Sequence, residues 1–298
     1  MNVERALARL QAGQNLNTAE TMALARDDGA VTALVSALRA ASDASRERGV
    51  PLMIDLGRVR VPPDGPVPER PGPIIDSPEI VAFLVEALVD GNADVRRRAG
   101  MALAGLVPAD LLRTQANALF SAFERFPGTD GALIVLGKIT GQEALAFIES
   151  HPEVRQAPAE DVEMVRARLG NHSAEDAVIV AYVSADTAQA KALQARRLGY
   201  VGTDRAVRLL ARDIRTPLTY AWMDAGQRSL RVHIIEGLHL AYLREPVFWP
   251  PFMPPNDDSY YQKIEDWLTA KLGTRWENPR PPFLYQQSVP KAMPPRGR

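Results

Sequence analysis

Histidine and cysteine are scarce among the residues that could do acid–base or metal chemistry, since the sequence has four histidines and no cysteine beside 36 scattered carboxylates. His233 and Glu236 are three residues apart, so an α-helix would place both side chains on one face. A metal site needs further ligands that converge on the ion, and His151 and His172 fall in predicted turns elsewhere in the chain. We therefore expect structural roles for the histidines, and no metal or other cofactor.

The segment Asp90–Asp94 begins like a calcium-binding loop, with carboxylate and amide side chains at alternating positions. The sixth position of such a loop requires glycine and the twelfth requires a glutamate that binds through both oxygens. This sequence has Val95 and Met101 there. The pattern instead predicts an ordinary turn, with Asp94 as the N-cap of the next helix.

Four arginines recur at intervals of three and four residues, which predicts a basic stripe along one helix face. They are Arg205, Arg208, Arg212 and Arg215. Such a stripe is suited to phosphate groups of nucleic acid or to an acidic partner. Asp204 and Asp213 neutralise part of its charge, which favours a solvent-exposed face over a nucleic-acid site.

The composition excludes several classes of function. With 35 basic and 36 acidic residues, the chain has a formal net charge of −1, so no overall positive field draws it onto nucleic acid or an anionic membrane. The absence of cysteine excludes disulfides and thiolate chemistry, and no Gly-rich phosphate loop or nucleophile elbow occurs. Neither a signal peptide nor an apolar run long enough to span a membrane is present, so we expect a cytoplasmic protein.

The elements that position these side chains recur along the chain. Five leucines mark the repeat at spacings of 33, 33, 29 and 40 residues, and three alanines repeat the 33 and 29 spacings independently. The leucines are Leu103, Leu136, Leu169, Leu198 and Leu238, and the alanines are Ala144, Ala177 and Ala206. Apolar residues follow helical spacing around each anchor, so the pattern predicts a repeated helix pair that buries its apolar face only by stacking on its neighbours.

The predicted pairs have definite boundaries. Second helices are expected over residues 94–106, 129–138, 160–169, 187–198 and 227–243, and first helices are expected to start near Thr140, Ser173 and Thr203. Leu136-Gly137, Leu169-Gly170 and Leu198-Gly199 are read as helix ends where glycine permits the turn.

The motif Val95-Arg96-x-x-Ala99-x-x-Ala102-Leu103 resembles the second helix of the HEAT-repeat superfamily, in particular the short HEAT-like units named after phycobilisome lyases. The resemblance covers roughly residues 78–245. It implies an all-α fold, a right-handed α-solenoid with a concave groove formed mostly by second helices, and it says little about function.

The flanks of the repeat array differ in composition. Residues 1–48 predict an N-terminal helical cap or degenerate repeat, with helices at 18–25 and 29–48. Residues 49–77 form a Pro-rich insert, in which the segment 52–61 alternates like a short hairpin. Residues 246–298 predict a C-terminal cap and tail rich in proline and aromatic residues, with a helix from Ser259; packing on the last repeat is favoured over display to a partner.

The pattern favours a non-enzymatic scaffold or adaptor that binds a protein or peptide partner through the concave groove. Arg97 and Gly100 would line that groove, whereas Arg96 and Arg98 point elsewhere around the helix. The alternatives are an enzyme or enzyme subunit resembling the bilin lyases, for which no catalytic residue carries over, and a nucleic-acid-binding protein that uses the arginine stripe. The oligomeric state stays open.

Overall fold

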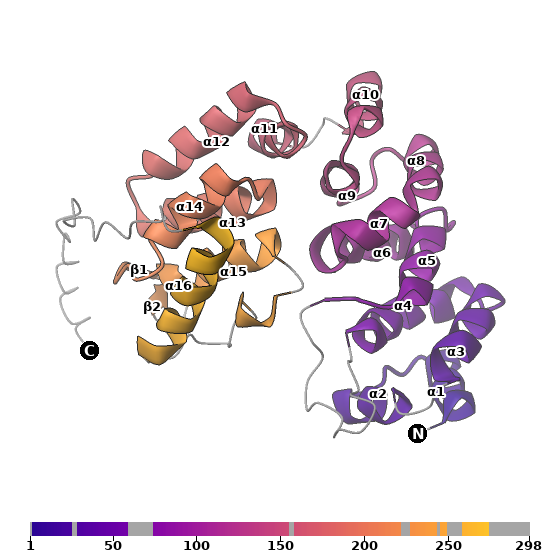
Figure 1. Cartoon of the computed structure of the whole chain (residues 1–298). Helices are drawn as coiled ribbons and strands as arrows, with labels where there is room; N and C mark the ends of the chain where they lie inside the picture. The colour runs from indigo at the N-terminus through magenta and orange to yellow at the C-terminus, as the bar shows by residue number, and fades with distance from the viewer. Residues whose placement is uncertain are drawn as a thin grey trace, which may run out of the picture.

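The computed structural model describes residues 2–25, 29–58, 74–154, 158–221, 227–242, 245–248 and 258–273. These residues are almost entirely helical, which confirms the predicted all-α class. No helix in this part of the chain is both long and apolar enough to cross a membrane. Figure 1 shows the chain passing from the indigo helices near the N-terminus to the orange and yellow helices near the C-terminus.

The first half of the chain contains α1 (Val3–Gln11), α2 (Thr18–Leu24), α3 (Ala30–Arg39), α4 (Asp43–Gly57), α5 (Pro78–Ala87), α6 (Ala93–Leu106), α7 (Ala109–Thr114), α8 (Ala116–Arg125) and α9 (Ala132–Ile139). The second half contains α10 (Gln142–Ser150), α11 (Ala159–Arg168), α12 (His172–Val183), α13 (Ala188–Val201), α14 (Asp204–Arg212), β1 (Thr219–Ala221), β2 (Gln227–Ser229), α15 (Leu230–Ala241), the 3₁₀ helix η3 (Pro246–Phe248) and α16 (Asp258–Leu272).

Alternate helices pack on one another along the chain. Helix α4 contacts α6, α6 contacts α9, α9 contacts α11, α11 contacts α13, and α13 contacts α15. We call these six helices the central row. The last five of them coincide with the predicted second helices, apart from one to three residues at most ends. Their anchor leucines are buried, except for the partly buried Leu169 at the C-cap of α11.

Short polar side chains set where many of the helices begin. Asn and Thr side chains accept a backbone N–H of the first turn in α12, α13 and α14, from Asn171, Thr187 and Thr203 respectively. This satisfies donors that have no partner within the helix. The start at Thr203 is the predicted one. At α6 the cap is Asn92, which accepts from the Asp94 N–H, so the prediction of Asp94 as N-cap was wrong.

Two of the three predicted Leu-Gly helix ends were wrong. Gly170 has a φ of 95° directly after α11, as expected of a glycine that ends a helix. Gly137 and Gly199 instead lie inside α9 and α13. A Cβ atom on Gly199 would lie 2.0 Å from the carbonyl oxygen of Gly237 in α15. Glycine at these positions serves close helix packing, which a single sequence does not distinguish from a helix stop.

The Pro-rich insert starts later than its composition predicts. Helix α4 continues through Pro51 to Gly57, so the hairpin prediction was wrong for residues 52–57. Leu52, Met53 and Leu56 are buried in the core, and this packing compensates for the hydrogen bond that proline cannot donate. The predicted single helix 29–48 is divided between α3 and α4, and residues 59–73 lie outside the described part of the chain.

Helix α15 is shorter than predicted at its start. Residues 227–229 form β2, which pairs antiparallel with β1 so that Tyr220 is opposite Arg228. Ser229 then caps α15 through the Arg231 N–H. The small sheet places Tyr220 next to the first turn of α15.

The described C-terminal elements pack on the end of the array. Helix α16 contacts α14 and η3, and the Phe248 ring lies 4.8 Å from the Trp267 ring, edge to face. Phe248 is completely buried. The tail aromatics Trp276, Phe283 and Tyr285, whose packing the sequence predicts, lie outside the described residues.

Close packing in the central row generates a stability prediction. Gly199→Ala should lower the free energy of unfolding by about 2–3 kcal/mol, because its methyl group would overlap the backbone of α15. Gly105→Ala is the matched control, since nothing lies within 4 Å of a Cβ at this helical position. The control should gain roughly 0.5–1 kcal/mol from helix propensity. Urea denaturation measures both, and equal effects of the two variants would contradict the packing argument.

Candidate functional site

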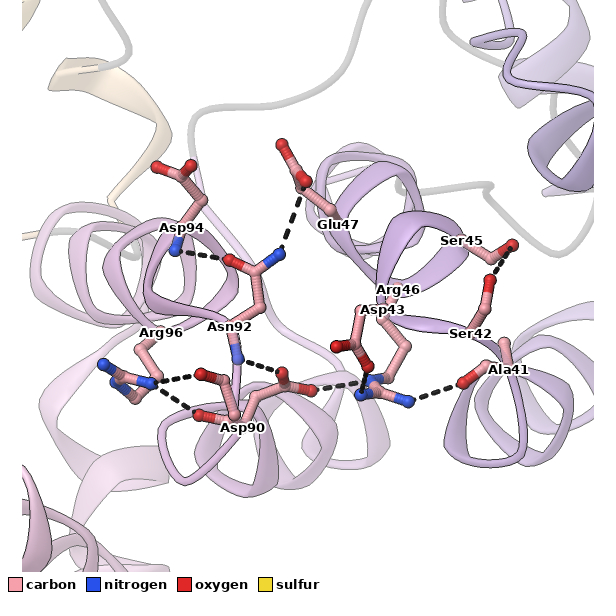
Figure 2. Close-up of polar contacts among 11 residues, drawn as sticks. Ala41, Ser42, Asp43, Ser45, Arg46, Glu47, Asp90, Asn92, Asp94 and Arg96 are labelled. Carbon is pink, nitrogen blue, oxygen red and sulfur yellow. Dashed lines mark hydrogen bonds and ion pairs between the residues drawn. The ribbon is translucent and has the colours of Figure 1, made fainter.

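The turn before α6 is a structural junction. Figure 2 shows the Asp90 carboxylate accepting hydrogen bonds from Arg46 of α4 and from the Asn92 backbone. The Nη1 of Arg96 donates to the Asp90 and Gly91 carbonyl oxygens at 2.7 and 3.0 Å. The Asp90 carboxylate therefore joins α4 to the turn between α5 and α6, and Arg96 stabilises the same turn.

The predicted groove residues of α6 have separate environments. Arg97 is exposed and pairs with Asp94 of its own first turn, at 3.0 Å between Nη2 and Oδ1. Gly100 is buried, and a Cβ there would lie 2.1 Å from the Asp130 carbonyl oxygen. The prediction that Gly100 lines an open groove was wrong, because the 129–131 segment packs directly against it.

The four arginines of the predicted stripe each contact a particular partner. Helix α14 ends at Arg212, so Arg215 lies in the following turn and not on the helix face as predicted. Arg215 pairs with Glu265 of α16 through two nitrogens, at 2.6 and 2.8 Å, and Arg208 donates to the Leu272 carbonyl at the end of α16. Arg205 pairs with Asp176, and Arg212 with Asp213. Two of the four arginines, Arg208 of α14 and Arg215 of the turn after it, thus hold α16.

Removal of one of these contacts should loosen α16. Arg215→Met deletes a two-bond ion pair whose carboxylate is largely buried, at a cost of about 2 kcal/mol. We expect faster hydrogen–deuterium exchange in α16 while the central row stays protected. Arg205→Met is the control, since its pair is more than half exposed on both sides and contributes under about 1 kcal/mol. Unchanged exchange in α16 of Arg215→Met would show that the pair does not hold the helix.

The histidines occupy four unlike environments. His151 stacks on Phe147 and contacts its carbonyl oxygen at 2.9 Å, and His172 is almost fully exposed. His233 and His239 are buried on α15. Within the ranges that the structure describes, no three His, Asp or Glu side chains gather in a way that would hold a metal ion.

Lys138 is the most unusual charged residue of the central row. It lies on α9, is 2% exposed, and donates from Nζ to the Val107 carbonyl oxygen at 3.1 Å. Burial, with a further contribution from the charge of Arg168, lowers the pKa of its amine to about 7. No carboxylate in the described part of the chain lies within ion-pair distance of it.

Arg168 of α11 lies beside Lys138 and binds Tyr200 of α13. One Nη donates to the Tyr200 carbonyl oxygen, and the guanidinium carbon is 4.9 Å from the centre of the tyrosine ring. The Tyr200 hydroxyl donates to the Ile134 carbonyl of α9 at 2.7 Å. Burial lowers the pKa of Arg168, and its Nε has no hydrogen-bond partner among the described residues.

A third basic side chain, His239 of α15, completes this group. Burial, together with the charge of Lys138, lowers the pKa of His239 to about 4, so the imidazole is neutral at physiological pH. Its buried Nδ1 has no partner within the described structure. Buried polar atoms without partners are uncommon in proteins and often mark places where a ligand or water binds.

Lys138 and Arg168 line a cleft of about 230 Å³ between segments that are distant in sequence. We call it the cation cleft. Its other lining residues are Pro108, Ala109, Asp110, Leu240, Ala241, Tyr242 and Glu245. The cleft thus combines two cations without carboxylate partners, an apolar wall, and two carboxylates. Its volume is below the ~300–1,000 Å³ of typical small-molecule sites, so it suits a single charged side chain or terminal carboxylate.

Sequence reasoning missed this cleft. Lysine is rare here and Lys138 follows a buried run in α9, so a buried lysine could have been suspected from the segment "ALIVLGKI". Its proximity to Arg168 and Tyr242 depends on helices separated by 30 to 100 residues, which no local pattern shows.

Neither the protein-family models nor the curated proteins that were compared with this sequence give a match. The likeness to HEAT-like repeats therefore rests on the residues quoted above.

The low pKa of Lys138 predicts a pH dependence of stability. Between about pH 7 and the unfolded value of 10.5, the unfolded chain binds a proton at this lysine that the folded chain does not bind. Stability should therefore rise with pH over this window, with a slope of at most about 1.4 kcal/mol per pH unit. Lys138→Met keeps the apolar stem and should flatten the slope. Urea denaturation of the wild type and of Lys138→Met from pH 7 to 9 measures this. Equal slopes of the unfolding free energy against pH in the two proteins would contradict the prediction.

Proposed function

We propose that this protein is a HEAT-like α-solenoid adaptor that binds a protein or peptide partner along its central row, and that an acidic group of the partner occupies the cation cleft. The continuous packing from α4 to α15 and the buried leucine anchors support the repeat architecture. Helix pairs stacked in this way present an extended surface to a partner. On this proposal α16 and Phe248 serve as the cap that covers the apolar end of the array.

The observation that carries the proposal is the pair of cations in the cation cleft that have no carboxylate partner among the described residues. Holding Lys138 and Arg168 together without a carboxylate costs free energy, because each is desolvated and repels the other. A partner carboxylate would supply the missing charge and a hydrogen-bond acceptor for the Arg168 guanidinium. Binding would in turn raise the pKa of Lys138.

The same cleft disfavours a polyanion. Asp110 and Glu245 also line it. The phosphates of a nucleic acid that extended beyond the two cations would therefore be repelled by these carboxylates. Two arginines of the stripe, Arg208 and Arg215, contact α16. A peptide with one acidic anchor among uncharged residues therefore fits the charges better than a nucleic acid.

Selection from a random peptide library against the wild-type protein tests the proposal. We expect enriched peptides to share one Asp, Glu or C-terminal carboxylate next to apolar residues. Affinity for such a peptide should weaken at least about tenfold in Lys138→Met and in Arg168→Met. Arg205→Met removes a cation of an exposed pair on α14 and should bind as the wild type does.

Replacing the carboxylate of the selected peptide with its neutral amide distinguishes recognition of the charge from nonspecific binding. The amide peptide should bind all four proteins with the same weakened affinity, because the carboxylate that distinguishes them is gone. A selection that yields no acidic motif, or a Lys138→Met variant that binds like the wild type, would overturn the proposal.

A further inference from the structure

A hydrogen-bonded chain of three side chains lies at the junction of β1 and α15, apart from the cation cleft. The Tyr220 hydroxyl contacts Nε2 of His233, and Nδ1 of His233 lies 2.9 Å from Oε2 of Glu236. Arg228 of β2 holds the other carboxylate oxygen of Glu236 at 3.0 Å. Sequence analysis identified the His233–Glu236 spacing, but only the sheet brings the phenol to it.

The direction of the hydrogen bonds follows from the charge of Glu236. Burial acts to raise the pKa of this carboxyl, but the hydrogen bond from His233 and the charges of His233, Arg196 and Arg228 outweigh it and hold the pKa below its usual value. An ionised carboxylate only accepts, so Nδ1 of His233 carries a proton. When His233 carries only this proton, its Nε2 is an acceptor and the Tyr220 hydroxyl donates to it.

This chain opens onto a cleft of about 490 Å³. Tyr220 and His233 form one side, and the first turns of α13 form the other, through Thr187, Ala190, Leu193 and Arg196. Leu193 is an exposed apolar residue, 52% accessible, and offers a surface for an acyl chain. The exposed guanidinium of Arg196 is close enough to act electrostatically on both Tyr220 and Glu236.

We propose that Tyr220, His233 and Glu236 form a nucleophilic acyl-transfer site for a carboxylic ester with a small apolar acyl group. Tyr220 is the nucleophile, His233 the general base, Glu236 the positioning residue, and Arg196 stabilises the oxyanion. The arrangement matches the general pattern of a nucleophile, a base within hydrogen-bond reach, and a third group that orients the base.

The steps balance without any further reagent. The Tyr220 oxygen attacks the ester carbonyl carbon while Nε2 of His233 takes the phenol proton. The tetrahedral intermediate collapses, the bond to the leaving alcohol breaks, and His233 returns the proton to that alcohol. Water then attacks the acyl-tyrosine with His233 again as base, which releases the carboxylic acid and restores the phenol. Burial raises the pKa of Tyr220, so the phenol is protonated at rest and needs this base.

This site uses no residue of the proposed partner-binding cleft, so the two proposals fail or succeed separately. A hydrogen-bonded histidine–glutamate pair can also serve only to stabilise a fold. Structural support alone predicts no preferential reaction at Tyr220, and the experiment below distinguishes the two roles.

The test uses p-nitrophenyl acetate and the whole chain. We expect a burst of p-nitrophenol close to one equivalent, and an acetyl group located on Tyr220 by mass spectrometry of the digested protein. Tyr220→Phe keeps the ring beside His233 and should lose the burst, while Glu236→Gln should slow acylation roughly 100-fold, within the range of general-base contributions. Tyr260→Phe is the matched control, because its buried hydroxyl has no hydrogen-bond partner in the described structure, and it should react as the wild type does.

Location of the acetyl group on the wild-type protein decides the matter even if a variant fails to fold. Acetylation spread over lysines and exposed tyrosines, with no preference for Tyr220, would overturn the proposal. So would a folded Tyr220→Phe variant that retains the burst.

Discussion

Helices α13 and α15 meet at Gly199 and Gly237, where an added Cβ would lie 2.0 and 2.5 Å, respectively, from a backbone oxygen of the opposite helix. Such contact brings the helix backbones together and leaves no room for side chains between them. In the repeat array that we propose, each helix pair buries its apolar face by stacking of this kind. The close packing of α15 on α13 follows from this constraint.

Close stacking also determines which polar groups become buried. Tyr200 reaches from α13 to the Ile134 carbonyl of α9, and Arg168 of α11 reaches to the Tyr200 carbonyl, so three neighbouring helices of the central row share one set of hydrogen bonds. Lys138 is enclosed in the same region. Its low pKa is the consequence of burial next to another cation. We propose that an acidic group of a partner relieves this repulsion.

The charged surface has a different role from the one that its sequence pattern suggests. A run of arginines at helical spacing is a reasonable signal for phosphate binding when the residues are free. Here Arg208 and Arg215 secure α16, and Arg97 pairs with Asp94 on the same helix. The number and spacing of cations are visible in a sequence, but whether each has a partner is not. Lys138 and Arg168, which line the cation cleft without carboxylate partners among the described residues, come from different helices and share no motif.

The sequence by itself determined the all-α class, the bounds of five helices of the central row to within three residues, and the anchor leucines, because apolar periodicity and capping side chains act within a few residues. It did not distinguish a glycine that ends a helix from one that admits a neighbouring helix, and it did not foresee that packing keeps Pro51 inside α4. Only the tertiary structure decided that Lys138 meets Arg168 and that Tyr220 meets His233. Such contacts depend on the stacking of distant segments, and no local pattern encodes the partner that a buried charge or a phenol will find.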